Sequence, residues 1–442
     1  MLCTDGPVHS LVELSLVGEH RRGHGSLYAA LARGRVDVQR LRTALAGVPL
    51  PRAADGRLVL AVDITCWLRP AAHTSPERIL CHTYGRGKDQ HLMVPGWPYS
   101  VVVALETGRS SWTAPLDARR LAPGEDAATA TAGQLRETIA RLIAAGQWRP
   151  GDPDILIVAD AGYDAPRLAF LLQDLPVQVL ARMRSDRVLR RAAPPRAPGT
   201  TGRPPRHGGE FVFGDPTTWG QPDVTTANET RLDGHATARA WDRLHPRLTH
   251  RSAWVAQAGP LPIIEGTVIR LEIERLPSGA VPKPVWLWWS GTDATPAEVD
   301  RLWQAFLRRF DIEHTFRLLK QTLGWTCPKI RTPQAADRWT WLLLAAYTQL
   351  RLARGLAADL RRPWEKPTPP QRLTPARVRR GFRHLRPQLA CPARAPKPSR
   401  PGPGRPAGRS NRHPTPRHDV HIVGTTPRKT RKSTTSRPRR KG

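Results

Sequence analysis

In the stretch Asp154-Ile-Leu-Ile-Val-Ala-Asp160, five consecutive apolar residues lie between two carboxylates. A run this short and this apolar is typical of a strand that is buried on both faces of a sheet. Leu58-Val-Leu-Ala-Val-Asp63 has the same character, and Val177-Gln-Val-Leu-Ala181 predicts another strand. An amphipathic helical pattern runs from Ala127 to Ala145, between these strands. Strands interleaved with helices predict an α/β domain.

Composition divides the rest of the chain around this core. Strand-like fragments between residues 210 and 290 predict a β-rich insertion, and two helices, 296–323 and 334–360, return the chain to the core. The predicted segments are a helical N-terminal segment (1–51), the first part of the core (56–190), a Pro- and Arg-rich linker with the β-rich insertion (191–290), the last part of the core (291–362), a short helical extension (363–390) and a basic tail (391–442) that we expect to be disordered.

The N-terminal segment has two interpretations. Its apolar residues predict short helices, which suit either a small helix-turn-helix for DNA or a helical cap on the next domain. No residue in it identifies a recognition helix, so both interpretations stay open.

The charge of the chain indicates its partner. It has 69 Lys and Arg against 37 Asp and Glu, a formal net charge of +32, which favours nucleic acid. Five scattered cysteines form no zinc-binding pattern and fit a reduced compartment. No run approaches the ~18 apolar residues of a membrane span, and no signal peptide precedes the core. We therefore expect a cytoplasmic protein that associates with the nucleoid through DNA and does not contact membranes.

Three acidic residues are the candidates for catalysis. Asp63 and Asp160 end predicted strands, where open α/β sheets place their sites. The helix that follows the insertion contains Phe306, Arg309, Glu313 and Lys320, at spacings of three, four and seven residues, which one continuous helix would place on a single stripe. The alternative is an ordinary solvated face of i,i+4 ion pairs.

These residue types suit phosphodiester chemistry. Cleavage or transfer of a DNA strand needs charge neutralisation at the attacking and the leaving oxygen, which two hard cations ~4 Å apart supply when carboxylates bridge them. Asp63, Asp160 and Glu313 would provide the oxygen ligands. Arg309 and Lys320 would hold the DNA backbone beside the cations.

The spacing of this stripe resembles a family signature. The chain is similar to bacterial insertion-sequence transposases that have a DDE triad and the signature Tyr-x2-Arg-x3-Glu-x6-Lys. Here the signature is Phe306, Arg309, Glu313 and Lys320, with Phe in place of Tyr. The family's second-aspartate motif, Asp followed by Gly and an aromatic residue, matches Asp160, Gly162 and Tyr163, and its first aspartate matches Asp63.

The resemblance covers about residues 56–360 and implies more than the residues alone do. It implies a ribonuclease H-like mixed sheet flanked by helices, interrupted by a β-rich insertion. It also implies cleavage of double-stranded DNA at transposon ends and joining to target DNA, with two Mg²⁺ ions for which Mn²⁺ can substitute, by a homodimer that bridges two ends. Phe306 and Tyr163, like Arg309 and Lys320, would then contact DNA.

Two other functions compete with this one. The first is a catalytically inactive, transposase-derived DNA-binding protein, which the Tyr-to-Phe change at position 306 leaves open. The second is a ribonuclease H-like nuclease that cleaves without joining. Dependence of the activity on transposon ends would separate a transposase from that nuclease.

Overall fold

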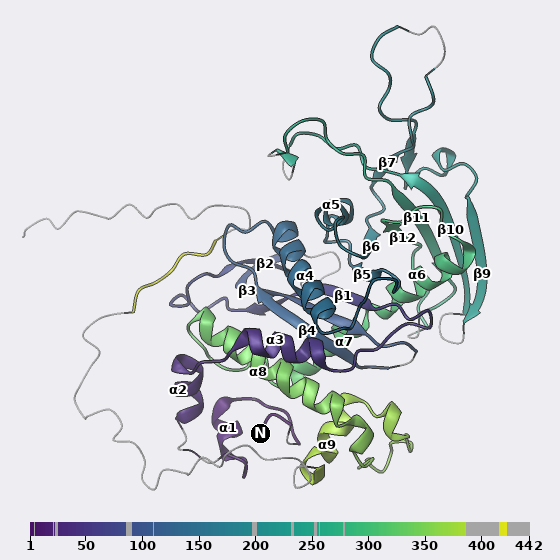
Figure 1. Cartoon of the computed structure of the whole chain (residues 1–442). Helices are drawn as coiled ribbons and strands as arrows, with labels where there is room; N and C mark the ends of the chain where they lie inside the picture. The colour runs from purple at the N-terminus through teal and green to yellow at the C-terminus, as the bar shows by residue number, and fades with distance from the viewer. Residues whose placement is uncertain are drawn as a thin grey trace, which may run out of the picture.

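The computed structural model of the protein describes residues 1–3, 5–20, 22, 25–84, 91–108, 110–196, 201–230, 234–251, 254–255, 257–276, 279–385 and 415–421. Within these residues the protein is α/β and ribonuclease H-like, with one large mixed sheet between layers of helices (Figure 1). No helix among them is long and apolar enough to cross a membrane.

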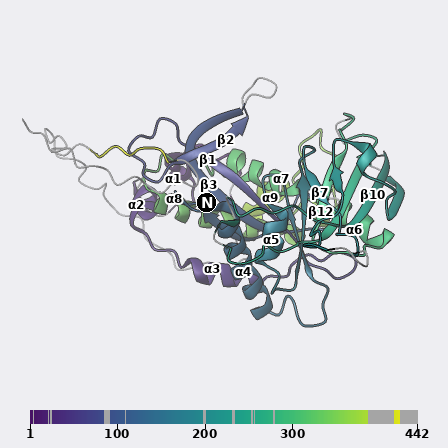
Figure 2. The same ribbon diagram turned by 90° about the horizontal axis from the view of Figure 1, so that it is seen from above.

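The large sheet runs in the order β2-β3-β1-β5-β6-β12-β11-β10-β9, with β4 paired to β3. Figure 2 shows it passing across the molecule from β2 at one end toward β10 at the other. The strands are β1 Val59–Leu68, β2 Ile79–Tyr84, β3 His91–Leu105, β4 Thr113–Arg120, β5 Ile155–Ala159, β6 Val177–Met183, β9 Val224–Thr230, β10 Gly234–Leu244, β11 Gly266–Ile273 and β12 Val285–Trp289.

The predicted buried strands lie at the centre of this sheet. β1, β5 and β6 are parallel neighbours, while β3 runs antiparallel to β1. All five residues of β5 are buried, as its uninterrupted apolar sequence predicts. The sequence did not predict β2 or β4, which lie outside these central strands.

Helices cover both faces of the sheet. On one face α4 (Ala127–Ala144) and α5 (Ala165–Leu171) pack with Leu60, Val62 and Ile157. On the other face α6 (Pro296–Arg308), α7 (Asp311–Arg317) and α8 (Pro333–Leu352) pack with alternate residues of the same strands, including Ala61 and Val158. Because side chains alternate across a strand, one apolar run supplies both cores.

The predicted helix from 296 to 323 is not continuous. It ends as α6 at Arg308, resumes as α7 after Arg309 and Phe310, and finishes in a π-helical turn, Leu318–Thr322. The amides of Arg309, Ile312 and Glu313 donate to carbonyls three residues earlier, which tightens the chain at the junction. The four signature residues therefore do not share one regular helical stripe.

The β-rich region continues the main sheet instead of forming a separate one, because β12 pairs with β6. Phe211, Trp219, Trp241 and Trp286 form an aromatic cluster there, with Phe211 and Trp286 ring centroids 6.0 Å apart. These indoles are therefore mainly core residues. A small hairpin, β7 (Val188–Arg190) with β8 (Glu210–Val212), precedes them.

The N-terminal segment packs on the core. Its helices are α1 (Leu11–Leu16), α2 (Ser26–Arg33) and α3 (Val38–Gly47), and Arg42 on α3 makes an ion pair of 3.0 Å with the fully buried Asp117 on β4. Leu11 and Leu31 join the same core as α8. Of the two interpretations of this segment, the packing favours the helical cap.

The C-terminal region follows α8 with one further helix, α9 (Pro375–Leu385). Most of the predicted disordered tail, 391–442, lies outside the described residues. Residues 415–421 differ from that prediction, because the backbone of His421 bridges to Ile79 and accepts a hydrogen bond from Leu80 on the edge strand β2. An edge strand has unpaired backbone groups, and this segment satisfies some of them.

Candidate active site

Asp63 and Asp160 come from neighbouring parallel strands. Ala61 lies opposite Val158 in the register of β1 and β5, so the two acids, each two residues further along, are level. Both project to the face that α6 and α7 cover, because Ala61 and Val158 do. Asp160 directly follows β5, as predicted, whereas Asp63 lies inside β1, which continues to Leu68. β5 ends at Ala159, before β1 does, so among the described residues β1 has no paired neighbour on the β5 side at the level of Asp63.

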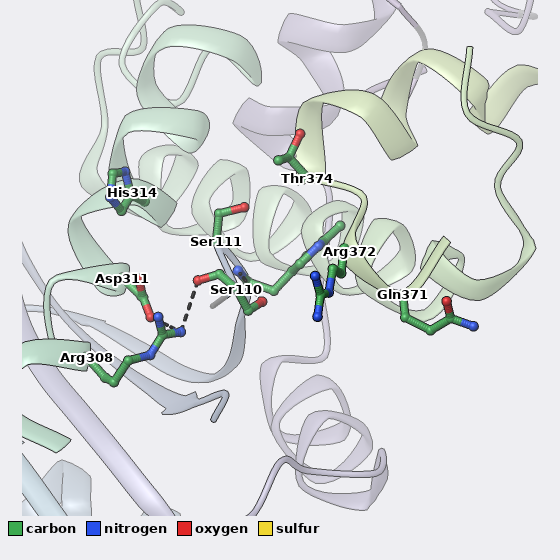
Figure 3. Close-up of a pocket in the computed structure, with 9 residues that line it drawn as sticks. Ser110, Ser111, Arg308, Asp311, His314, Gln371, Arg372 and Thr374 are labelled. Atoms are coloured by element: carbon green, nitrogen blue, oxygen red, sulfur yellow. Dashed lines mark hydrogen bonds and ion pairs between the residues drawn. The ribbon is translucent and has the colours of Figure 1, made fainter. Parts of the chain in front are cut away.

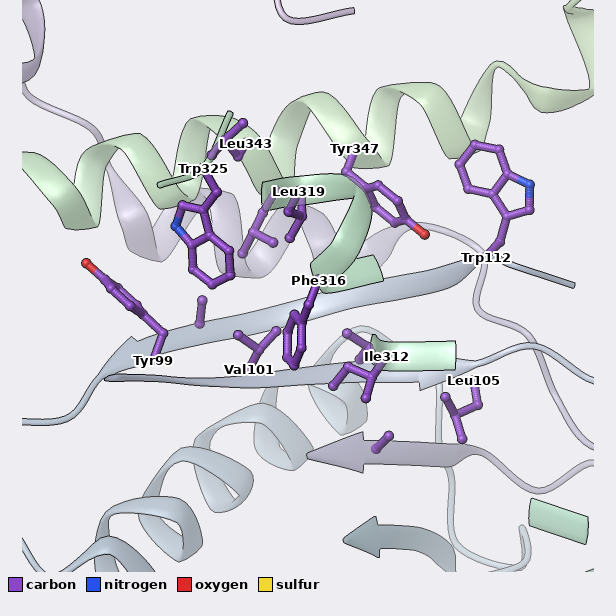
Figure 4. Close-up of a cluster of buried hydrophobic side chains, with 14 of the residues drawn as sticks. Tyr99, Val101, Leu105, Trp112, Ile312, Phe316, Leu319, Trp325, Leu343 and Tyr347 are labelled. Carbon is purple, nitrogen blue, oxygen red and sulfur yellow. The ribbon is translucent and has the colours of Figure 1, made fainter. Parts of the chain in front are cut away.

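The third acid is brought to this place by α7. Ile312 and Phe316, on the buried side of α7, pack on β3 near Val101 and Leu105 (Figure 4). The short helix is thereby fixed across the sheet, and Glu313, between these two anchors, has a side chain that is 42% exposed. Phe310, at the junction before α7, is by contrast half exposed.

One guanidinium contacts all three acids. Arg309 Nη1 lies 3.2 Å from Asp63 Oδ2, and Nη2 lies 3.2 Å from Glu313 Oε1 and 3.9 Å from Asp160 Oδ1. Because two of these oxygens share Nη2 and the third contacts the neighbouring Nη1, the carboxylates surround a single cationic group. The structure thus brings together Asp63, Asp160 and Glu313, which lie far apart in the sequence.

Arg309 has a different environment from the one expected from the sequence. It was expected to face DNA, but its side chain is 9% exposed and ion-paired, and its guanidinium lies 5.9 Å from the ring centroid of Phe306. Phe306 is itself buried, and its ring packs against the guanidinium of Arg309. The i,i+4 spacing of Arg309 and Glu313 was the signal for this ion pair.

Burial dominates the electrostatics of Asp63. It raises the pKa of the Asp63 carboxyl to about 6, against the opposing effect of the Arg309 charge and a hydrogen bond of 2.8 Å from the Ile64 amide. The hydroxyl of Tyr163 is buried close to Asp63, and burial together with that negative charge raises its pKa well above the ordinary value. The side chain of Tyr163 packs against the core on the face of the sheet that α4 and α5 cover.

Lys320 reaches the same region from the π-helical turn. Burial lowers the pKa of its ammonium group, while the charges of Cys66 and Asp63 oppose that shift. Lys320 is half-buried, unlike an ordinary surface lysine. The π-helical turn is the local feature that sequence spacing could not predict, and such turns are frequent at functional sites.

The acids are suitable ligands for a hard divalent cation. Carboxylate oxygens are the donors that Mg²⁺ prefers, and Asp160 Oδ1 is buried without a hydrogen-bond partner. Within the described residues, no three His, Cys, Asp or Glu side chains are close enough together to hold an ion as they stand. The guanidinium of Arg309 lies between the acids, so a cation and this side chain would compete for the same oxygens.

A separate cavity of about 310 Å³ lies beside the α6–α7 junction and is lined by residues that include Arg308, Asp311 and Ser110 (Figure 3). Arg308 and Asp311 form an ion pair in its wall, and Arg308 donates to the Ser110 carbonyl at 3.0 Å. Burial raises the pKa of the Asp311 carboxyl to about 7, although the Arg308 charge opposes the shift. This ion pair links the last residue of α6 to the first residue of α7.

A comparison with protein-family models identifies the family of the chain. The family model described as DDE superfamily endonuclease matches residues 1–247, which include Asp63 and Asp160. No curated protein matches the chain in sequence.

Two solved structures are distantly similar. Endonuclease V of Ciona intestinalis, in complex with a 24mer DNA containing an inosine followed by a ribo-adenosine, is 10% identical with a TM-score of 0.22, over 70% of this chain and 97% of that one. The Drosophila P element transposase strand transfer complex is 15% identical with a TM-score of 0.15, over 37% of this chain and 39% of that one. At these TM-scores neither likeness establishes a shared fold.

The family match spans more than half of the chain and includes both strand-borne aspartates of the acidic cluster. The protein therefore belongs to the DDE superfamily endonucleases.

Proposed function

We propose that this chain is a DNA transposase that cuts the ends of an insertion sequence and joins them to target DNA. The observation that carries the proposal is the position of Arg309, whose guanidinium contacts Asp63, Asp160 and Glu313 together. The signature spacing around Glu313 supports strand transfer over simple hydrolysis, because it resembles that of insertion-sequence transposases. DNA as partner is supported by the net charge of +32.

Asp63, Asp160 and Glu313 would hold two Mg²⁺ ions, with Mn²⁺ as a substitute, and the ions would neutralise charge on the attacking and leaving oxygens of the phosphodiester. The β1 and β5 backbones fix the two aspartates, whereas Glu313 is held by α7, a helix of only seven residues. When cations enter the site, the side chains that move would therefore be mainly those of Glu313 and Arg309.

Arg309 would act first as a counter-ion. In the absence of a divalent cation it neutralises acids that would otherwise repel each other in a partly buried site. When the acids are occupied by cations, its guanidinium would turn toward the phosphate backbone, for which its planar donors are suited. Lys320, beside Asp63, would contribute a second positive charge to that phosphate.

Cleavage of a duplex that carries the element's own ends tests this function. With Mg²⁺ the full chain should cut the end and, in a second step, join its 3′-hydroxyl to a target duplex. Asp63→Asn, Asp160→Asn and Glu313→Gln should each lower both steps by several orders of magnitude while leaving binding to the duplex intact. Asp174→Asn and Glu137→Gln, both exposed acids on the surface, are the matched controls and should react as the wild type does.

The same experiment separates the competing functions. The occupation of the acidic cluster by Arg309 favours, as a second candidate, a DNA-binding protein that has lost catalysis. Binding to end duplexes without cleavage in Mg²⁺ or Mn²⁺ would establish that candidate. Cleavage without joining, on any duplex, would instead indicate a nuclease. We expect two copies of the chain on two ends, which the mass of the DNA complex would show.

A further inference from the structure

Residues 191–209, which we call the basic arm, join β7 to β8 and project beyond the main sheet (Figure 1). The arm contains four arginines and five prolines and no acidic residue. Its residues 197–200 lie outside the described part of the chain, and the described part of the arm is its two sides and its base.

The base of the arm is firmly held. The Arg191 amide donates to the Gly209 carbonyl at 3.0 Å, and the Gly208 amide donates to the Arg191 carbonyl at 2.9 Å. A ring nitrogen of His207 lies 2.9 Å from one of the buried His245, which directly follows β10. The base of the arm is thus fixed to the sheet through backbone hydrogen bonds and through His245.

The arginines of this hairpin fall into two groups. Arg190 and Arg191 belong to the base, where Arg190 pairs with Glu210 and Arg191 bonds to the Trp219 carbonyl and lies over the ring of Phe211. These two residues stabilise the fold. The positive charge of the rest of the arm comes from its other arginines.

The outer group comprises Arg196, Arg203 and Arg206, all of which are exposed. Arg196 donates across the arm to the Gly202 carbonyl at 3.3 Å, which places it beside Arg203. Neither Arg203 nor Arg206 has a hydrogen bond or ion pair with any described residue. The outer arm therefore presents three guanidinium groups with no carboxylate among residues 191–209 to neutralise them.

The prolines stiffen this presentation. Pro194 and Pro195 precede Arg196, and Pro204 and Pro205 precede Arg206. Proline fixes its own φ and keeps the residue before it extended, so such segments favour polyproline II, with three residues per turn and ~3.1 Å rise per residue. Arg203 and Arg206 would then lie on one edge, roughly 9 Å apart. Three nucleotides advance a DNA strand by about 10 Å.

We propose that the basic arm is a DNA-contact element outside the active site, which holds the phosphate backbone of duplex DNA through Arg196, Arg203 and Arg206. The inference rests on the proposed function for the identity of the polyanion as DNA. An arm held at its base loses less conformational freedom on binding than an unstructured tail does.

The test is the salt dependence of DNA binding by the full chain. In the variant Arg196→Gln, Arg203→Gln, Arg206→Gln, three phosphate contacts are lost, so the slope of log K against log salt should become shallower by about 2.7. Affinity for a 40-base-pair duplex near 0.1 M salt should fall by about ten- to hundredfold. Substituting the same three positions with lysine should retain most of the slope, because phosphate contact needs charge more than shape.

The matched control is Arg33→Gln, Arg35→Gln, Arg40→Gln, which removes the same charge from three exposed positions in the N-terminal segment. An equal loss of slope in this control would mean that affinity follows total charge, and would overturn the proposal, as would an unchanged slope in the arm variant. A greater loss on RNA of the same length than on duplex DNA would also overturn it. If the wild type neither binds nor cleaves end duplexes, the proposed function itself fails. If it does both and the arm variant binds like the wild type, only the arm proposal fails.

Discussion

Replacing Arg309 with glutamine would remove the guanidinium that contacts all three acids. Two of its contacts, to Asp63 and Glu313, have hydrogen-bond lengths of 3.2 Å, and the contact to Asp160 is longer, at 3.9 Å. A hydrogen bond between charged groups contributes about 1.5–3 kcal/mol when it is shielded from water, as that to Asp63 is. The contact to Glu313, whose side chain is 42% exposed, contributes roughly 0.5 kcal/mol.

A divalent cation must overcome these contacts to occupy the acids. Arg309 therefore opposes cation binding by about 2–3.5 kcal/mol, and its removal should tighten the binding of Mn²⁺ by about 30- to 400-fold in the absence of DNA. Titration calorimetry or the spin-resonance signal of free Mn²⁺ measures this affinity directly. Without a cation, Arg309→Gln should also unfold at a lower temperature than the wild type, and Mn²⁺ should restore its stability.

The control for this prediction is Arg308→Gln. It removes the same charge from the adjacent residue, which pairs with Asp311 and not with the three acids. We expect its affinity for Mn²⁺ to stay close to that of the wild type. Equal or weaker Mn²⁺ binding by Arg309→Gln would refute the reasoning, because the guanidinium would then not be competing with the cation.

Three further changes have defined outcomes. Lys320→Met should slow end cleavage at least tenfold with little change in melting temperature, and a large drop in melting temperature would instead make Lys320 a structural residue. Phe316→Ala should cost about 3–5 kcal/mol of unfolding free energy and abolish cleavage, because Phe316 seats α7 on β3; cleavage at the wild-type rate by the folded variant would contradict that role. The pKa of Asp311 is raised to about 7 from an ordinary value of 3.8, so the stability it contributes is complete below pH 4 and is lost as pH rises through 7. In urea unfolding, the free energy of unfolding of the wild type should therefore fall by up to about 3 kcal/mol between pH 5 and 8, and that of Asp311→Asn should not show this fall. If the unfolding free energies of both proteins changed with pH in the same way, the pKa of Asp311 would not be raised.

The central strands of the sheet could be predicted from the sequence because their burial is visible as short runs of consecutive apolar residues. A strand such as β5, covered on both faces, must be apolar at every position, and the five residues from Ile155 to Ala159 are. The acids at positions 63 and 160 stood out because each follows such a run. The strands β2 and β4, away from this centre, lack that signal, and neither was predicted.

The rest of the site depends on contacts between distant parts of the chain. The periodicity from 296 to 323 predicted one helix, but anchoring Ile312 and Phe316 on β3 goes with a break after Arg308 and a π-helical turn before Leu323. The i,i+4 spacing allowed an ion pair between Arg309 and Glu313, which the structure contains. The spacing of residues along the helix could not predict that the same guanidinium also contacts Asp63 and Asp160, which come from two strands of the sheet.

The central claim is that Asp63, Asp160 and Glu313 together hold the cations that catalyse DNA cleavage. Anomalous diffraction from crystals of the full chain with an end duplex and Mn²⁺ tests it most directly. We predict two Mn²⁺ peaks ~4 Å apart, each within about 2.3 Å of oxygens from these side chains, with the Arg309 guanidinium turned away from them. Mn²⁺ bound elsewhere, with Arg309 still paired to all three acids while DNA occupies the site, would contradict it.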